Sequence, residues 1–123
     1  TVVADKSSNV KWVAADLIGQ AEHDENAQCI LISKNKELIN KVQKELEIQL
    51  QSLPRKKIAI GSLKKNGLLI FANSDKKISD IINIIAPEHL EIDFKGYKNI
   101  LKKIKNAGSI FIGNSHLRLW EIT

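Results

Sequence analysis

Ala86-Pro87-Glu88-His89-Leu90-Glu91 marks the point where an isoleucine-rich helical pattern changes to a strand pattern. Pro87 disfavours the helical region for the residue before it, so we expect the helix to end here and Glu88 and His89 to lie in an irregular turn that precedes the strand. A neutral imidazole accepts a proton near pH 7, and a carboxylate can do so when its pKa is raised. Glu88 and His89 are therefore a candidate acid/base pair, although a Glu-His dipeptide is more often a solvated surface feature.

The pattern on both sides of this junction predicts alternating strands and helices. We expect strands at residues 2–4, 28–32, 68–71, 90–94 and 109–112, and helices at residues 10–23, 35–51, 55–65, 76–85 and 97–105. Residues 55–65 fit a strand or a short helix, and we favour the helix. Residues 68–71 are continuously apolar, which predicts an interior strand, and residues 109–112 are expected to form the last strand.

Strands that alternate with helices through short loops favour an α/β fold with parallel strands. We expect an incomplete Rossmann-like domain with a mostly parallel sheet of about four to five strands flanked by helices. Ligands of such sheets bind outside the carboxyl ends of the strands, whereas Glu88 and His89 precede their strand. Topology therefore does not predict whether this pair lies near the first long helix.

That helix, residues 10–23, carries a second group of candidate residues. Gln20 and His23 are three residues apart, so their side chains project side by side and could bind one ion or substrate. Asp16 lies one turn earlier and could orient Gln20. Taken singly, each of these residues is more often a solvated group on a helix surface.

The composition limits the classes of protein to which this chain can belong. With 123 residues, 43% hydrophobic and 27% charged, the chain has the length and balance of one globular domain. No apolar run approaches the roughly 20 residues that span a bilayer, and the first residues lack the pattern of a secretory signal, so we expect a cytoplasmic protein without a membrane partner. The single cysteine, Cys29, lies in an apolar run and is predicted to be a core thiol.

The net charge of +5 raises the alternative of a nucleic-acid partner. The lysines are spread over most of the predicted helices and loops, and the aromatic residues, 5% of the chain, do not interleave with them. Solvated helix faces explain this charge better than a nucleic-acid surface, because a basic face with a stacking platform is missing. We do not expect nucleic acid as a partner.

Three stretches together resemble the histidinol dehydrogenase family. They are residues 13–24 (VAADLIGQAEHD), 86–91 (APEHLE) and 106–113 (NAGSIFIG), which occur in the family's order and at similar spacing. The resemblance extends over residues 1 to about 113, which are similar to the second half of the family's zinc- and substrate-binding domain, and residues 114–123 form a divergent tail.

The resemblance implies an oxidoreductase of histidine biosynthesis. Members of this family oxidise L-histidinol to L-histidine through histidinal, with two hydride transfers to NAD, one zinc ion and a homodimeric assembly. Gln20 and His23 match two zinc ligands of the family, and both residue types are acceptable zinc donors. His89 matches the base that takes the hydroxyl proton, and Glu88 matches the residue that activates water for attack on the aldehyde.

The sequence also departs from the family. Its members are much longer, and the resemblance leaves out their NAD-binding half and a carboxy-terminal segment that supplies another zinc ligand. A family Asp that binds zinc would fall near Ile122, and His116 or Glu121 are the substitutes that the tail offers. Zinc and NAD are thus implied by resemblance, but we expect the zinc site to be incomplete and the NAD-binding half to be absent.

Three hypotheses follow. The chain is a truncated remnant of histidinol dehydrogenase that is inactive on its own, or it is one chain of a split enzyme that a complementing fragment completes. The third alternative is a non-catalytic metal-binding, ligand-binding or interaction module. The first two imply histidinol as the small-molecule substrate, and a homodimer is a further expectation from the resemblance.

Overall fold

The structure is a computed structural model that describes residues 1–23, 28–54, 56–113 and 118–122, the last of these by backbone alone. Its elements, in chain order, are β1 (Val2–Ala4), α1 (Val10–His23), β2 (Cys29–Ser33), α2 (Lys36–Leu50), α3 (Lys56–Asn66), β3 (Gly67–Phe71), α4 (Asp75–Ile85), β4 (His89–Asp93), α5 (Tyr97–Leu101), β5 (Ser109–Gly113) and β6 (Arg118–Ile122). The described strands form one sheet in the order β3-β2-β1-β4-β5-β6. Neighbouring strands from β3 to β5 are parallel, and β6 is antiparallel to β5. The expected α/β class with a mostly parallel sheet is confirmed.

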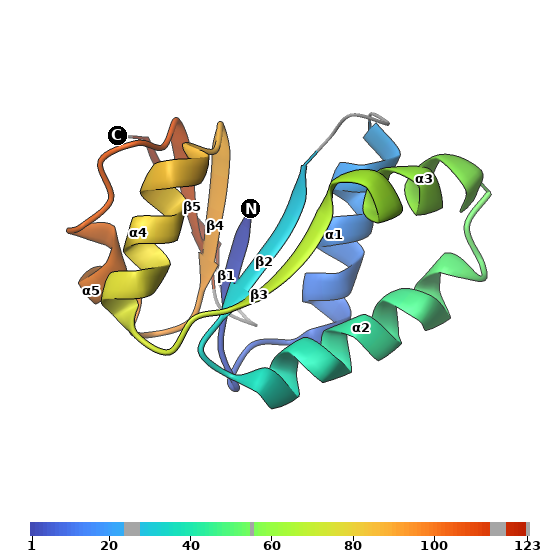
Figure 1. Cartoon of the computed structure of the whole chain (residues 1–123), viewed down its shortest axis with the longest axis horizontal. Helices are drawn as coiled ribbons and strands as arrows, with labels where there is room; N and C mark the ends of the chain where they lie inside the picture. Colours follow the sequence, from blue (N-terminus) through green and yellow to red (C-terminus); the bar gives the residue numbers. More distant parts are fainter. Residues whose placement is uncertain (24–27, 55, 114–117, 123) are drawn as a thin grey trace.

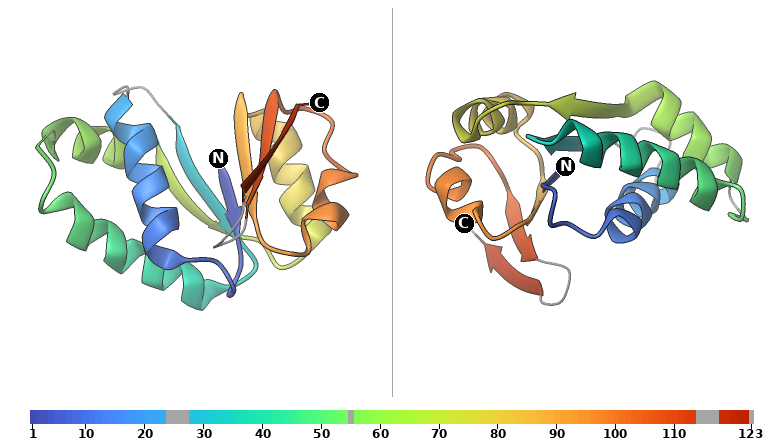
Figure 2. Two further views of the ribbon diagram at one scale, coloured as in Figure 1. Left: turned by 180° about the vertical axis from the view of Figure 1, so that it is seen from behind. Right: turned by 90° about the horizontal axis from the view of Figure 1, so that it is seen from below.

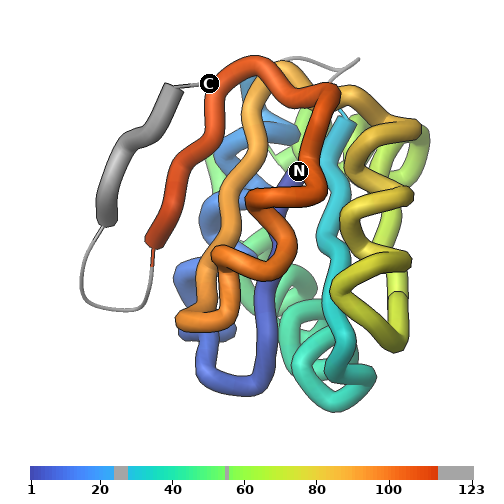
Figure 3. Tube along the Cα trace, turned by 90° about the vertical axis from the view of Figure 1, so that its left-hand side faces the viewer, coloured from blue at the N-terminus to red at the C-terminus, as the bar shows by residue number. Residues whose placement is uncertain are grey.

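Helices cover both faces of this sheet. Helices α1, α2 and α3 lie on one side, and α4 and α5 lie on the other (Figures 1 and 2). Successive side chains of a strand point to opposite faces, so the central strands supply two cores. Val2 and Leu31 belong to the cluster under α1, α2 and α3, whereas Val3, Ile30 and Ile32 belong to the cluster under α4 and α5. Strands β1, β4 and β5 lie side by side in the sheet (Figure 3).

Side-chain caps fix where the helices begin. Asn9 accepts a hydrogen bond from the Trp12 amide at 3.0 Å, and Asn35 accepts one from the Leu38 amide at 2.8 Å. Each cap pairs an amide that has no partner within the helix, which contributes about 1 kcal/mol. The start of α1 at Val10 and of α2 at Lys36 follows from these two asparagines.

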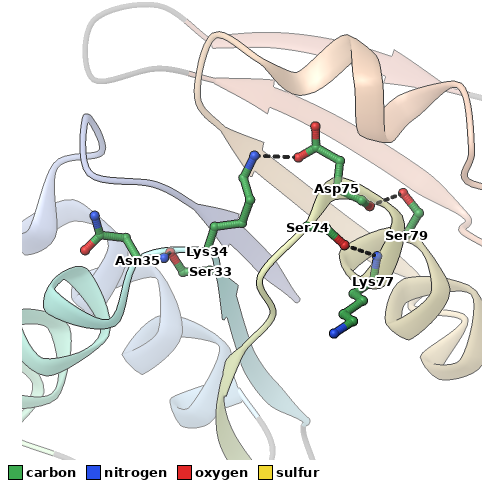
Figure 4. A network of polar contacts seen from close by, with 7 residues as sticks. All are labelled: Ser33, Lys34, Asn35, Ser74, Asp75, Lys77 and Ser79. Carbon is green, nitrogen blue, oxygen red and sulfur yellow. Dashed lines mark hydrogen bonds and ion pairs between the residues drawn. The ribbon is translucent and has the colours of Figure 1, made fainter.

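Helix α4 is tied to the loop that follows β2. Ser74 caps α4 by accepting from the Lys77 amide at 3.1 Å, and Ser79 donates to the Asp75 carbonyl at 2.8 Å. Lys34 donates to the Asp75 carboxylate at 2.7 Å (Figure 4). The Lys34–Asp75 ion pair joins the loop after β2 to the start of α4 at the carboxyl edge of the sheet.

At its other end, α4 stops in a left-handed residue. Ala86 has φ 49° and ψ 58° and donates its amide to the Ile82 carbonyl at 2.8 Å. Pro87 explains why the helix stops here, since it excludes the right-handed helical region for Ala86. Only Glu88 lies in a bend before the strand. The expectation that His89 also lies in the turn is wrong, because His89 pairs with Ser109 as the first residue of β4.

Helix α5 is shorter than the periodic pattern predicts. It ends at Leu101 instead of residue 105. The Asn83 side chain of α4 donates to the Lys103 carbonyl at 3.1 Å and accepts from the Lys105 amide at 2.7 Å. These backbone groups are therefore engaged outside α5, and the chain continues as a turn instead of a helix.

Two expectations about the strands are also corrected. β3 lies at an edge of the sheet, not in its interior, and β5 is followed by β6. Periodicity does not distinguish an apolar edge strand from an apolar interior strand. The preference for a helix in the ambiguous segment is confirmed by α3, with residue 55 outside the described residues.

Candidate active site

A cleft of about 930 Å³ opens at the amino edge of the sheet. Its walls come from the second half of α1, from the segments that enter the strands and from the α4–β4 junction. They are formed by Thr1, Ala15, Asp16, Gly19, Gln20, His23, Gln28, Ala86, Pro87, Glu88, His89, Leu90, Glu91, Ser109 and Phe111. Gln20, His23, Glu88 and His89 thus share one cleft, at the edge opposite to the one that open α/β sheets generally use.

The position of the cleft follows from how the helices cover the sheet. Leu90 and Ile92 of β4 belong to the core under α4 and α5, so His89 and Glu91 point to the opposite face. On that face α1 packs against β1 and β2. The cleft lies beside α1, where β4 and β5 carry His89, Glu91 and Phe111.

Helix α1 presents Asp16, Gln20 and His23 from one face. The Gln20 amide nitrogen donates to a carboxylate oxygen of Asp16 at 2.9 Å. A carboxylate only accepts hydrogen bonds when ionised, so this bond orients the Gln20 amide group and leaves its oxygen for other partners. This hydrogen bond supports the expectation that Asp16 orients Gln20.

Glu88 and His89 have exposed side chains on a well-held backbone. The Glu88 carbonyl accepts from the Ser109 amide at 2.8 Å, and the Pro87 carbonyl accepts from the Gly108 amide at 3.1 Å. The His89 carbonyl accepts from the Thr1 nitrogen at 3.2 Å. Backbone hydrogen bonds to residues 108 and 109 on one side and to Thr1 on the other fix the direction in which the Glu88 and His89 side chains leave the backbone.

The third sequence block, residues 106–113, supports the second. Asn106 donates from its side chain to the Asn83 carbonyl at 3.2 Å and from its amide to the Asn83 side chain at 3.2 Å. A Cβ atom on Gly108 would lie 2.7 Å from the Glu88 carbonyl oxygen. Glycine at position 108 thus permits the close approach that places Glu88 at the mouth of the cleft.

Carboxylates dominate the charge of the cleft. Asp16, Glu88 and Glu91 contribute acidic groups, and His23 and His89 contribute imidazoles. In this chain burial lowers the pKa of the Thr1 amino group, while Glu91 and Asp16 act in the opposite direction. This chemistry suits a ligand that carries a positive charge or hydrogen-bond donors.

Zinc fits the described residues only in part. Gln20 and His23 offer an amide oxygen and an imidazole nitrogen, but the described residues contain no group of three or more His, Cys, Asp or Glu placed to hold a metal ion. Catalytic zinc sites normally use three protein ligands. His116 and the side chain of Glu121 lie outside the part that the structure describes, so the two candidate donors do not complete a site.

The comparisons with known proteins agree with the sequence blocks. The family model for histidinol dehydrogenase matches residues 1–118. The chain belongs to the histidinol dehydrogenase family. It is 59% identical to a histidinol dehydrogenase of Pelagibacter ubique over 113 residues and 49% identical to one of Bacillus cereus over 112 residues. A crystal structure of histidinol dehydrogenase from Elizabethkingia anophelis superposes with a TM-score of 0.87 at 38% identity.

The family match has a limited extent along the relatives. These alignments cover 92%, 91% and 93% of this chain but 26% of each relative. The chain therefore spans about a quarter of the length of the histidinol dehydrogenases that it matches. No helix in the described ranges is long and apolar enough to cross a membrane.

Sequence reasoning did not single out several residues of the cleft. Glu91 lies two residues after His89 in β4, so the period of a strand could have placed both on one face. Thr1, Gln28 and Phe111 enter the cleft only because β1, β2 and β5 are parallel to β4 in one sheet, in the order β2-β1-β4-β5. That alignment depends on the strand order, which no local motif predicts.

Proposed function

We propose that this chain forms the proton-transfer part of a histidinol dehydrogenase site and acts in the NAD-dependent oxidation of L-histidinol to L-histidine. The observation that carries the proposal is the shared cleft of Gln20, His23, Glu88 and His89, which come from α1 and from the α4–β4 junction, 65 or more residues apart in sequence (88 − 23 = 65). The family membership supplies the reaction.

The roles proposed for Glu88 and His89 are those that the family resemblance implies, and the chemistry of both side chains suits them. The His89 imidazole takes the proton that the substrate hydroxyl releases in the alcohol step. The Glu88 carboxylate takes a proton from the water molecule that attacks the aldehyde. Both side chains are exposed in the cleft and can exchange these protons with solvent between the two steps.

Gln20 and His23 are proposed as two donors to zinc, with the remaining donors lying outside the described residues. The sequence has no glycine-rich dinucleotide fingerprint, so the described residues are assigned no contact with NAD. We therefore propose that these 123 residues alone do not oxidise histidinol. In domain terms, residues 1–113 correspond to part of the zinc- and substrate-binding domain and residues 114–123 diverge, although the family match itself reaches residue 118.

A chimera tests the site within a full-length member of the family. Residues 1–113 of this chain replace the matching segment of the Pelagibacter ubique histidinol dehydrogenase, and NADH formation from histidinol is followed by absorbance. The chimera is expected to be active, and His89→Ala is expected to lower kcat by about 10²–10⁴. Lys95→Ala, at an exposed position after β4, is the control and should leave kcat unchanged.

Two results would contradict the proposal. A folded, zinc-loaded chimera without histidinol oxidation would show that the inherited site is not competent. Conversely, NADH formation by the purified 123-residue chain with histidinol, NAD and zinc, abolished by His89→Ala, would show that the chain needs no further polypeptide.

A further inference from the structure

His89 and Ser109 are neighbours on two adjacent strands. Strands β4 and β5 are parallel and lie side by side (Figure 1), and their ladder pairs His89 with Ser109 and Leu90 with Ile110. Leu90 and Ile110 both belong to the core under α4 and α5. Because successive side chains of a strand point to opposite faces, His89 and Ser109 share the other face, and both line the cleft.

Ser109 is the polar residue of the described strands that the sheet places nearest to His89. Neighbouring strands are about 4.7–4.9 Å apart, whereas residues two apart on one strand are separated by about 6.5 Å. Glu91, the next residue of β4 on the cleft face, is therefore farther from His89 along the sheet than Ser109 is. His89 is exposed and Ser109 is half-buried, so both side chains can turn toward each other within the cleft.

The backbone holds the two residues in this register. The Ser109 amide donates to the Glu88 carbonyl at 2.8 Å, and the Gly108 amide donates to the Pro87 carbonyl at 3.1 Å. These bonds join the segments that enter β4 and β5, so rotation of the two side chains is enough to bring their polar atoms together. The Ser109 hydroxyl makes no hydrogen bond to another described residue in this structure, and it can both donate and accept one.

We propose that Ser109 is a positioning residue for His89, with its hydroxyl oxygen accepting a hydrogen bond from Nδ1–H of the imidazole. Serine Oγ is bonded directly to Cβ and stays near the sheet, where Nδ1 is the nearer ring nitrogen, whereas Nε2 lies at the tip of the ring. A hydrogen bond at one ring nitrogen determines which nitrogen carries the proton. With the proton on Nδ1, the lone pair of Nε2 can accept the hydroxyl proton of the substrate. The use of His89 as a base rests on the proposed function, whereas the contact with Ser109 does not.

The tautomer of His89 in the 123-residue chain tests this contact without any reaction. Long-range ¹H–¹⁵N spectra at about pH 8.5, where imidazoles are ordinarily neutral, distinguish the Nδ1–H form from the Nε2–H form that histidine favours in water. The His89 signals are those that His89→Ala removes. We expect mainly the Nδ1–H form in the unchanged chain and in Ser109→Thr, which keeps a hydroxyl, and a shift toward the Nε2–H form in Ser109→Ala.

Ser52→Ala is the matched control for these spectra. Its hydroxyl is exposed after α2 and donates to the Gln49 carbonyl at 3.2 Å, away from the cleft residues. The tautomer of His89 should stay unchanged in this variant. The melting temperature of each variant is measured alongside, because a merely structural role of Ser109 would lower stability without moving the tautomer.

The chimera described above extends the test to the reaction. Ser109→Ala is expected to lower kcat by about tenfold or more and to leave KM for histidinol unchanged, because the lost hydrogen bond orients the base and does not hold the substrate. Ser109→Thr should restore most of the lost kcat. An inactive chimera would count against the proposed function alone, because the tautomer is read in the chain without substrate.

Three results would overturn the proposal. The first is a predominant Nε2–H form in the unchanged chain, a measurement that needs no variant to fold. The second is an unchanged tautomer in a folded Ser109→Ala chain. The third is loss of the Nδ1–H form in Glu91→Gln but not in Ser109→Ala, because the Glu91 carboxylate would then be the partner of the imidazole.

Discussion

Gly108→Ala tests whether the third sequence block holds the candidate acid/base pair in place. The added methyl group would lie 2.7 Å from the Glu88 carbonyl oxygen, about 0.7–1.3 Å short of an ordinary contact of 3.4–4 Å. No described glycine has a positive φ, so alanine meets no backbone strain at this position. The expected effect is therefore steric, and it falls on the backbone of Glu88.

The magnitude follows from two opposing effects. Overpacking of this kind typically costs about 1–3 kcal/mol, and replacing glycine with alanine recovers about 0.4–1 kcal/mol by restricting the unfolded chain. We expect Gly108→Ala to lower the free energy of unfolding by about 1–2 kcal/mol net. Gly61→Ala is the matched control, because Gly61 lies within α3 and the new methyl group meets nothing within 4 Å beyond its chain neighbours and its own helix backbone. It should raise the free energy of unfolding by about 0.5–1 kcal/mol.

Urea unfolding followed by circular dichroism measures both variants. Amide NMR spectra of the folded chain should show shifts at Glu88 and His89 for Gly108→Ala and none there for Gly61→Ala. If Gly108→Ala were as stabilising as the control and left both signals in place, the close approach between residues 88 and 108 would not exist. The proposed support of the site by the third block would then be wrong.

Three further predictions concern single residues. Asp16→Ala should move the side-chain amide signals of Gln20 in ¹⁵N spectra, because it removes the acceptor of their 2.9 Å hydrogen bond. The control Asp80→Ala on α4 should leave these signals in place. Unchanged Gln20 signals in Asp16→Ala would contradict the orienting role of Asp16. Ala86→Gly should raise the free energy of unfolding by up to about 1 kcal/mol in urea titrations, because a left-handed conformation costs a non-glycine residue roughly 1–2 kcal/mol. A glycine variant less stable than the unchanged chain would argue against the left-handed cap. Burial raises the pKa of the Cys29 thiol, so the native state favours the protonated form, and that stabilisation is present below the usual thiol pKa and is lost as pH rises through the native pKa. The difference in unfolding free energy between the unchanged chain and Cys29→Ala should therefore shrink as pH rises above the usual thiol pKa of about 8.5, and parallel pH profiles would refute this.

The sequence predicts those features that depend on local chemistry. The bounds of α1 agree with the expected residues 10–23, because apolar spacing defines its inner face and Asn9 marks its start. The end of α4 at Ile85 follows from Pro87, which acts on its neighbour alone. The contact between Asp16 and Gln20 was also within reach, since residues four apart on a helix lie side by side.

Features that depend on distant partners were not predictable in this way. The length of α5 is limited by Asn83, a residue on another helix, and this contact leaves no trace in the local periodicity. The edge position of β3 depends on the strand order, which the apolar sequence of β3 does not determine. The amino-edge location of the cleft depends on which strands α1 leaves uncovered. Each of these requires the assembled sheet.

The architecture separates the residues that fold this chain from those proposed to act in it. His23, Glu88 and His89 are exposed, whereas Pro87, directly before the pair, and Leu17, on the inner face of α1, are buried. Substitutions of exposed side chains away from caps and packed contacts usually change stability by about 0.5 kcal/mol or less. The fold can therefore persist without proton transfer at this site, because His23, Glu88 and His89 belong to neither core cluster. Activity in turn needs more than the fold, since the described residues offer two candidate zinc donors and no complete set. Stability of the fold and proton transfer at His89 can therefore be measured and lost independently.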